Sequence, residues 1–329
     1  MYRKIMGFLE AWKESEHRKP LILQGARQVG KTYSILEFGR THYENVAYFN
    51  FETNPKLNET FEENISPDYL IPILSHIAGQ TIVRETTLIV FDEVQLCERA
   101  LTSLKYFCED APDYHIIVAG SLLGVAVNRA KFSFPVGKVD MKTLYPMDME
   151  EFMLALGEDD LVEQIKKCFQ TDTPLPSALH DAAIQLYRRY LVVGGMPECV
   201  MQFAETKDYI LVRHTQDTIL ASYLNDMSKY NNLNEIKKTR LAYDNITVQL
   251  SKKNTRFQYK LIKKGGRASE FENAIEWLCL SGIVSQVYKV EQIKKPLENY
   301  RDIDAFKIYV SDLGLLCAKK DLAANDILY

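Results

Sequence analysis

The segment of residues 25–32 has the most specific chemical pattern in the chain. Its sequence, GARQVGKT, fits the spacing G-x-x-x-x-G-K-[ST] and lies between a short apolar run at 20–23 and a helical stretch that stops at Gly39. In such a loop, backbone N–H groups bind phosphate oxygens at a helix start, and Lys31 brings positive charge to the β- and γ-phosphates. The alternative is a glycine-rich turn that binds nothing. The predicted nucleotide-binding residues are Gly25, Ala26, Arg27, Gln28, Val29, Gly30, Lys31, Thr32 and Tyr33.

Two adjacent carboxylates supply the second part of such a site. Residues 88–91 form an uninterrupted apolar run, typical of a buried parallel strand, and Asp92 and Glu93 follow it directly. A carboxylate at this end of a strand faces the ligand crevice. We expect Asp92, usually through water, and the Thr32 hydroxyl to hold Mg²⁺, and Glu93 to polarise the attacking water. The alternative is a pair of solvated carboxylates at the end of a strand.

A third candidate follows another apolar run. Residues 115–119, HIIVA, predict a strand, and Ser121 comes two residues after it. A polar residue in this place often contacts the γ-phosphate in P-loop ATPases, so Ser121 is a candidate catalytic residue. Helix N-capping before the sequence LLGVAV is an equal alternative.

These residues need a particular scaffold. Strands are predicted at 20–23, 45–52, 88–91, 115–119 and 136–145, and helices after residue 32 and at 148–156. Strands that alternate with helices predict an α/β fold with a parallel sheet and helices on both faces, of the P-loop NTPase type. All the candidate residues named above would then lie near the carboxyl ends of strands.

The chain's length and composition limit its class. It has 329 residues, a formal charge of −4 and 47% hydrophobic residues, so we expect a globular cytoplasmic protein that is not basic as a whole. No signal peptide or membrane-spanning run is evident, and the six scattered cysteines indicate free thiols in a reducing compartment. A proline-rich break at 171–177 divides the chain. The predicted parts are an ATPase domain at 1–170, a helical region at 171–230 and a winged-helix-like domain at 231–329.

The winged-helix expectation rests on the last hundred residues. Helices are predicted at 236–250, 258–264 and 268–281, followed by strands at 283–290 and 305–310. Winged helices often bind DNA, but the third helix carries Glu270, Glu272 and Glu276, which would oppose phosphates. A basic segment precedes it, so both DNA binding and a solvated packing surface remain open. The basic segment comprises Lys252, Lys253, Arg256, Lys260, Lys263, Lys264 and Arg267.

Several motifs together resemble one family, the bacterial and archaeal AAA-type ATPases that carry a C-terminal domain of unknown function. They are GARQVGKT, FDEVQ, AGSLLG, FPVGKVDMKTLYPMDMEEF, GGMPE, SYLNDM and FKIYVSDLGL, and they span essentially the whole chain. The resemblance implies ATP and Mg²⁺ as ligands, and catalytic sites of this type often form between protomers. Many relatives place an arginine where this chain has Lys138, and a lysine lacks the bidentate guanidinium. Arg129 is the remaining candidate for that catalytic role, and a solvated loop arginine is the alternative.

The C-terminus departs from that family in another way. Relatives typically continue into a nuclease-like segment with an E-x-D-F-V motif, and this chain reaches Tyr329 without it. We therefore expect either that the natural protein continues further or that it is a variant without this segment. No nuclease residues are assigned.

Several functions fit these observations. The first is an ATPase that couples its nucleotide state to a protein or nucleic-acid partner. The second is a nucleotide-controlled binding module with little intrinsic hydrolysis, since a protomer without a catalytic arginine would hydrolyse ATP slowly. The third is DNA or RNA binding through the basic segment. A small-molecule kinase shares the phosphate-binding loop, but the Asp92–Glu93 pair and the long helical second half argue against it.

Overall fold

The computed structural model describes residues 1–329 except 122–133, 230–231 and 254–255. The chain divides into two compact units, which are described separately. The N-terminal unit is Arg3–Tyr145, and the C-terminal unit is Pro146–Tyr329 together with Met1–Tyr2. Among the described residues, no helix combines the length and apolar character needed to cross a membrane.

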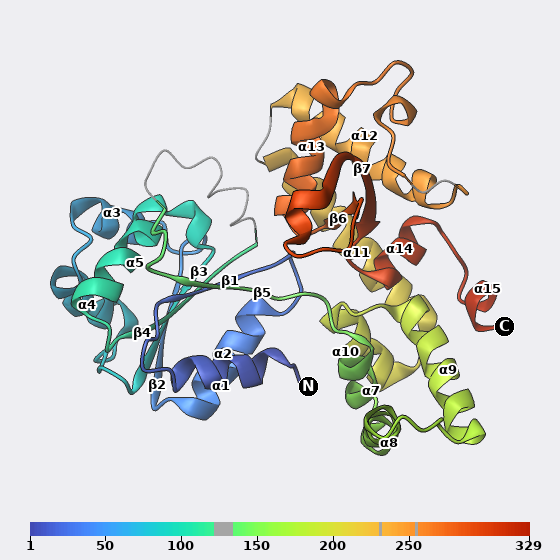
Figure 1. The fold of residues 1–329 in the computed structure, drawn as a ribbon. Coiled ribbons are helices and arrows are strands. Elements are labelled where there is room, and N and C mark those ends of the chain that lie inside the picture. The colour runs from blue at the N-terminus through green and yellow to red at the C-terminus, as the bar shows by residue number, and fades with distance from the viewer. Residues whose placement is uncertain (122–133, 230–231, 254–255) are drawn as a thin grey trace. The chain divides into compact units, whose positions relative to one another are not determined.

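The N-terminal unit is built on a five-stranded parallel sheet in the order β2-β3-β4-β1-β5 (Figure 1). The predicted α/β fold with a parallel sheet is therefore confirmed. The three inner strands are buried along almost their whole length, as their continuous apolar sequences require. The strands are β1 (Leu21–Gln24), β2 (Asn45–Asn50), β3 (Thr87–Asp92), β4 (His115–Gly120) and β5 (Asp140–Thr143).

Helices cover both faces of this sheet. One face packs against α3 (Lys56–Glu63), α4 (Pro67–Ala78) and α5 (Glu98–Asp110), with a cluster of phenylalanine rings at its centre. The other face packs against α2 (Lys31–His42), where Gly39 lies so close to Val46 and Leu88 that a Cβ would be 2.5 Å from a methyl group of Val46. Helix α1 (Ile5–Lys13) packs on α2. The inner strands are thereby shielded from water, and the carboxyl end of the sheet is left to carry loops.

The C-terminal unit begins earlier than the predicted boundary at residue 170. Helices α7 (Met149–Ala155) and α8 (Asp159–Gln170) share a hydrophobic cluster with α9 (Ser177–Val193), formed by Met153, Leu161, Val162 and Leu186. The proline-rich segment at 171–177 therefore joins two helices that pack in one unit. The compact units divide after Tyr145 because these apolar contacts group α7 and α8 with the helices that follow them.

A buried aspartate joins distant parts of this unit. The Asp312 carboxylate accepts hydrogen bonds from the N–H groups of Gly195 at 2.6 Å and Leu315 at 2.8 Å. Gly194, at φ 75°, allows the close approach, since a Cβ there would lie 2.3 Å from Asp312 Oδ1, and a Cβ on Gly195 would lie 1.9 Å from the carbonyl oxygen of Met147. Burial raises the pKa of Asp312, and the backbone N–H groups that it binds oppose this shift. Two motifs 117 residues apart thus form one buried contact.

The helices and strands predicted after residue 235 are present in the predicted order with one exception. Residues 258–264 form no α-helix; they contain only the 3₁₀ turn η2 (Tyr259–Leu261). The Gln249 side chain binds both backbone groups of Gln258, and the N–H of Phe257 donates to the carbonyl of Phe306, so the chain enters this segment extended. The helices are α10 (Pro197–Thr206), α11 (Tyr209–Lys229), α12 (Leu233–Leu250), α13 (Ala268–Leu280), α14 (Leu313–Lys319) and α15 (Asn325–Leu328), and the hairpin strands are β6 (Val284–Val290) and β7 (Arg301–Val310), with the short 3₁₀ helix η3 (Leu297–Tyr300) between them.

Candidate nucleotide-binding site

The phosphate-binding loop connects β1 to α2, and its glycines are required by geometry. Gly25 has φ 150°, and a Cβ there would lie 2.2 Å from the carbonyl oxygen of Leu144. Gly30 has φ 90° and immediately precedes Lys31, the first residue of α2. Both positions therefore exclude ordinary side chains.

Donor groups gather at this loop. The Lys31 ammonium donates to the carbonyl oxygens of Gly25 at 2.9 Å and Ala26 at 2.8 Å, and the side chain is buried. The first N–H groups of a helix have no acceptor within the helix. In the described part of the chain, the N–H groups of Val29 and Gly30 also have no acceptor. This donor set fits the oxygens of a polyphosphate.

Oxygen groups suited to a hard cation lie beside the loop. The Thr32 hydroxyl donates to Asp92 Oδ2 at 2.8 Å, and Asp92 is buried at the end of β3. Mg²⁺ in phosphate sites is bound by one or two protein oxygens together with substrate oxygens. Thr32 and Asp92 therefore fit the ligand set that the sequence predicts.

Tyr48 is a site residue that the sequence analysis missed. Its hydroxyl on β2 donates to the same oxygen of Asp92, also at 2.8 Å. Burial, followed by contacts that include Asp92, raises the pKa of Tyr48 to about 12, and a bond from Asn50 partly opposes this. Tyr48 therefore keeps its proton and remains a hydrogen-bond donor to Asp92.

Glu93 lies next to Asp92 and contacts it through its backbone. Its backbone adopts the left-handed conformation, φ 52°, and its N–H donates to Asp92 Oδ1 at 2.9 Å. Its Oε2 accepts a hydrogen bond from Gln95 Nε2 and a long one, 3.4 Å, from the Ser121 hydroxyl. Thr32 at the start of α2, Asp92 and Glu93 at the end of β3, and Ser121 after β4 thus form one hydrogen-bonded series. In the sequence, Gln95 stands out only as part of the motif FDEVQ, and the structure adds its contact with Glu93.

The other predicted residues are placed differently. Tyr33 and Gln28 are exposed, Ala26 is buried, and Arg27 is partly buried. The carbonyl oxygen of Val29 accepts from Arg3 Nη1 at 2.9 Å, and Arg3 Nη2 also binds the carbonyl of Tyr145 at 2.8 Å. No motif in the sequence marks Arg3, which binds the phosphate-binding loop from 26 positions earlier in the chain.

Two basic residues bear on the predicted arginine role, Lys138 and Arg129. Lys138 forms an ion pair with Glu109 of α5 at 2.8 Å. This contact raises the pKa of Lys138 and lowers that of Glu109. Lys138 is therefore bound on the surface of the unit. Arg129 lies outside the described residues.

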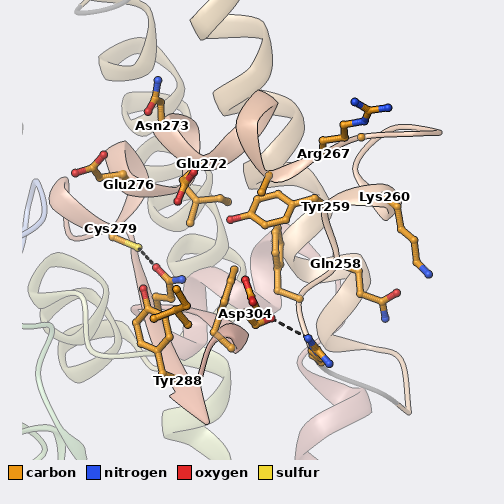
Figure 2. Close-up of a pocket in the computed structure, with 18 of the residues that line it drawn as sticks. Gln258, Tyr259, Lys260, Arg267, Glu272, Asn273, Glu276, Cys279, Tyr288 and Asp304 are labelled. Carbon is orange, nitrogen blue, oxygen red and sulfur yellow. Dashed lines mark hydrogen bonds between the residues drawn. The ribbon is translucent and has the colours of Figure 1, made fainter. Parts of the chain in front are cut away.

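A hollow of about 1150 Å³ lies in the C-terminal unit, between α13, the β6–β7 hairpin and the segment before η2 (Figure 2). Aromatic rings of Phe257, Tyr259, Tyr288 and Phe306 pack together along it. In Figure 2, Glu272 and Glu276 lie on the opposite side from Lys260 and Arg267. The face of α13 that lines the hollow is thus acidic.

Comparisons with known proteins agree with this geometry. Residues 17–153 match a family model described as an AAA domain, and residues 184–326 match one described as Domain of unknown function (DUF8612). No curated protein matches the chain.

Solved structures show the same fold. The Walker-type ATPase PABY2304 of Pyrococcus abyssi is 13% identical, with 97% of this chain and 95% of that chain covered and a TM-score of 0.59. The ORC2 protein of Aeropyrum pernix is 12% identical over 99% of this chain and 92% of its own, with a TM-score of 0.46. Such low identity shows the fold and nothing more. Residues 17–153 are therefore an AAA domain with the P-loop NTPase fold, and the chain joins it to a C-terminal domain of unknown function.

Proposed function

We propose that the protein is a Mg²⁺-dependent ATPase that converts ATP and water to ADP and phosphate. The observation that carries this proposal is the hydrogen-bonded series Thr32–Asp92–Glu93–Ser121 beside the Lys31 ammonium. Binding alone would need only the loop and its cation. A second carboxylate, adjacent to the metal-binding pair and held in a defined position, favours hydrolysis.

Each residue has a distinct role in the proposed reaction. Lys31 and the loop N–H groups bind the phosphate oxygens, and Thr32 and Asp92 would hold Mg²⁺. When bound, this ion supplies positive charge that stabilises the phosphates. Glu93 orients the attacking water and accepts its proton. Ser121 lies where it contacts Glu93 in the present structure, and we propose that it binds the γ-phosphate when nucleotide is present.

The second candidate is a nucleotide-controlled module with little basal turnover. This candidate is favoured by the residue at position 138, where relatives place an arginine. Here it is Lys138, and its ammonium is bound to Glu109. A protomer that lacks a catalytic arginine hydrolyses its nucleotide slowly. Tight ATP binding with negligible phosphate release by the isolated chain would support this candidate over the first.

Replacing Lys31 with Ala tests nucleotide binding. A hydrogen bond to a charged group contributes about 1.5–3 kcal/mol, so we expect ATP affinity to fall about 10–150-fold. The measurement is a titration of each variant with a fluorescent ATP analogue in the presence of Mg²⁺. The matched control is Lys138→Ala, which removes an equal charge on the surface and should bind as the wild type does. Wild-type affinity in Lys31→Ala would contradict the assigned site.

For the C-terminal unit we propose a winged-helix fold, because α12, the η2 turn, α13 and the β6–β7 hairpin follow one another in that order. Its charges favour a protein partner over a nucleic acid. Glu272 and Glu276 line the hollow beside the hairpin, and Lys263 of the basic segment is bound to Glu270 at 3.3 Å.

We therefore expect no retention of duplex DNA by the full chain at a physiological salt concentration of about 150 mM. The measurement is a gel-shift or anisotropy titration at several salt concentrations, with and without ATP. Binding that weakens steeply with salt and is lost in a Lys260→Glu, Arg267→Glu double variant would contradict this expectation and support the nucleic-acid alternative.

A further inference from the structure

The side chain of Gln95 contacts the carboxylate of Glu93. It lies in the 3₁₀ turn η1 (Val94–Leu96), directly after the pair of carboxylates, and its Nε2 donates to Glu93 Oε2. Its other side-chain atom, Oε1, is buried and has no hydrogen-bond partner in the described part of the chain. A buried acceptor without a donor costs about 1–3 kcal/mol, so such an atom calls for an explanation.

The orientation of the Gln95 amide follows from chemistry. An ionised carboxylate can only accept hydrogen bonds, so the amide nitrogen must face Glu93 and the amide oxygen must face elsewhere. The unused acceptor is therefore produced by the contact with Glu93 itself. This oxygen belongs to Gln95, two positions after Glu93, whose carboxylate would take a proton from water.

Glu93 has a strained backbone and few hydrogen-bond donors to its carboxylate among the described side chains. Its φ of 52° is unusual for a residue other than glycine and costs of order 1–3 kcal/mol. The long 3.4 Å contact from Ser121 is weak, so Gln95 is the main donor to this carboxylate among the described side chains. Loss of the Gln95 amide would leave the Glu93 carboxylate free to adopt other rotamers.

We propose that Gln95 is a positioning residue for hydrolysis: its Nε2 fixes the Glu93 carboxylate in the orientation that receives a proton from the attacking water, and the unpaired Oε1 is a consequence of that contact. The inference rests on the proposed ATPase function. With one water proton directed to Glu93, a lone pair of the water oxygen is left for the γ-phosphorus. As that O–P bond forms, the bond from the γ-phosphorus to the bridging oxygen breaks, its electron pair stays on ADP, and the water proton passes to Glu93.

The test uses two variants of the full chain. Gln95→Met keeps the length of the side chain and removes both polar atoms, and Gln95→Glu keeps the shape and removes the donor. Because a small misplacement of a reacting group can cost about 100-fold, we expect kcat to fall about 10–100-fold in Gln95→Met and further in Gln95→Glu. The affinity for ATP should stay within about twofold, because Gln95 does not belong to the loop. The matched control is Gln80→Met. The Gln80 side chain binds the carbonyl of Val46, and the variant should turn over ATP as the wild type does.

A double variant separates positioning from a general structural effect. If Gln95 acts through Glu93, then adding Gln95→Met to Glu93→Gln should lower the residual single-turnover rate by less than about twofold. A full additional 10–100-fold loss in the double variant, or a wild-type kcat in Gln95→Met, would overturn the role of Gln95. Absence of turnover in the wild type would instead overturn the proposed function, and this inference with it.

Discussion

Replacing Glu93 with Gln is expected to lower kcat for ATP hydrolysis by about 10²–10³-fold and to leave ATP affinity within about twofold. The amide has nearly the shape of the carboxylate but cannot accept the proton of the attacking water, and general bases contribute about 10²–10⁴-fold. Affinity should persist because Lys31 and the loop N–H groups are unchanged. The measurement is steady-state phosphate release, together with a binding titration on the same sample.

The control for this experiment is Glu59→Gln on α3, which removes an exposed carboxylate of the same unit. It should hydrolyse ATP as the wild type does. Unchanged phosphate release in Glu93→Gln would show that Glu93 is not the base. Loss of ATP binding in that variant would show that Glu93 supports the loop and leave its chemical role without support.

Replacing Asp312 with Ala is expected to lower the free energy of unfolding of the C-terminal unit by about 3–5 kcal/mol. The substitution leaves the N–H groups of Gly195 and Leu315 buried without an acceptor, at about 1–3 kcal/mol each, and the bond from Leu315 is the N-cap of α14. Trp277 lies buried in this unit and Trp12 in the other, so Trp277 fluorescence in a Trp12→Phe background reports on the C-terminal unit alone.

The matched control for Asp312 is another N-cap. Asn232 caps α12 by accepting from the N–H of Glu235 at 3.0 Å, but it does so in an exposed position. We expect Asn232→Ala to cost about 1 kcal/mol in the same denaturant titration. An equal loss in the two variants would mean that Asp312 is only a helix cap and does not hold the Gly194–Gly195 turn.

Local patterns were enough to predict the sheet and the central part of the site. The inner strands are continuous apolar runs because both of their faces are covered, and this leaves a direct trace in the sequence. Thr32, Asp92, Glu93 and Ser121 follow strands or the phosphate-binding loop immediately. Parallel strands bring such residues to one edge, so their proximity could be expected before the strand order was known.

Residues that depend on strand order or on long contacts could not be predicted. Tyr48 contacts Asp92 only because β2 pairs with β3, and the two residues are 44 positions apart. Arg3 binds the carbonyl of Tyr145 across 142 positions. The predicted helix at 258–264 was wrong because contacts from Gln249 and Phe306 determine the backbone there, and a local pattern does not record such contacts.

The strand order also determines when the loop can form during synthesis. Strand β1 pairs with β4 and β5, and Gln24 at its end binds Thr143, which is 119 residues later in the chain. Leu144 then packs against Gly25. At about 5–20 residues per second, roughly 6–24 s pass between translation of these two parts. The phosphate-binding loop is thus among the last parts of its unit to take shape, and one edge of β1 stays unpaired until β4 is made and the other until β5 is made.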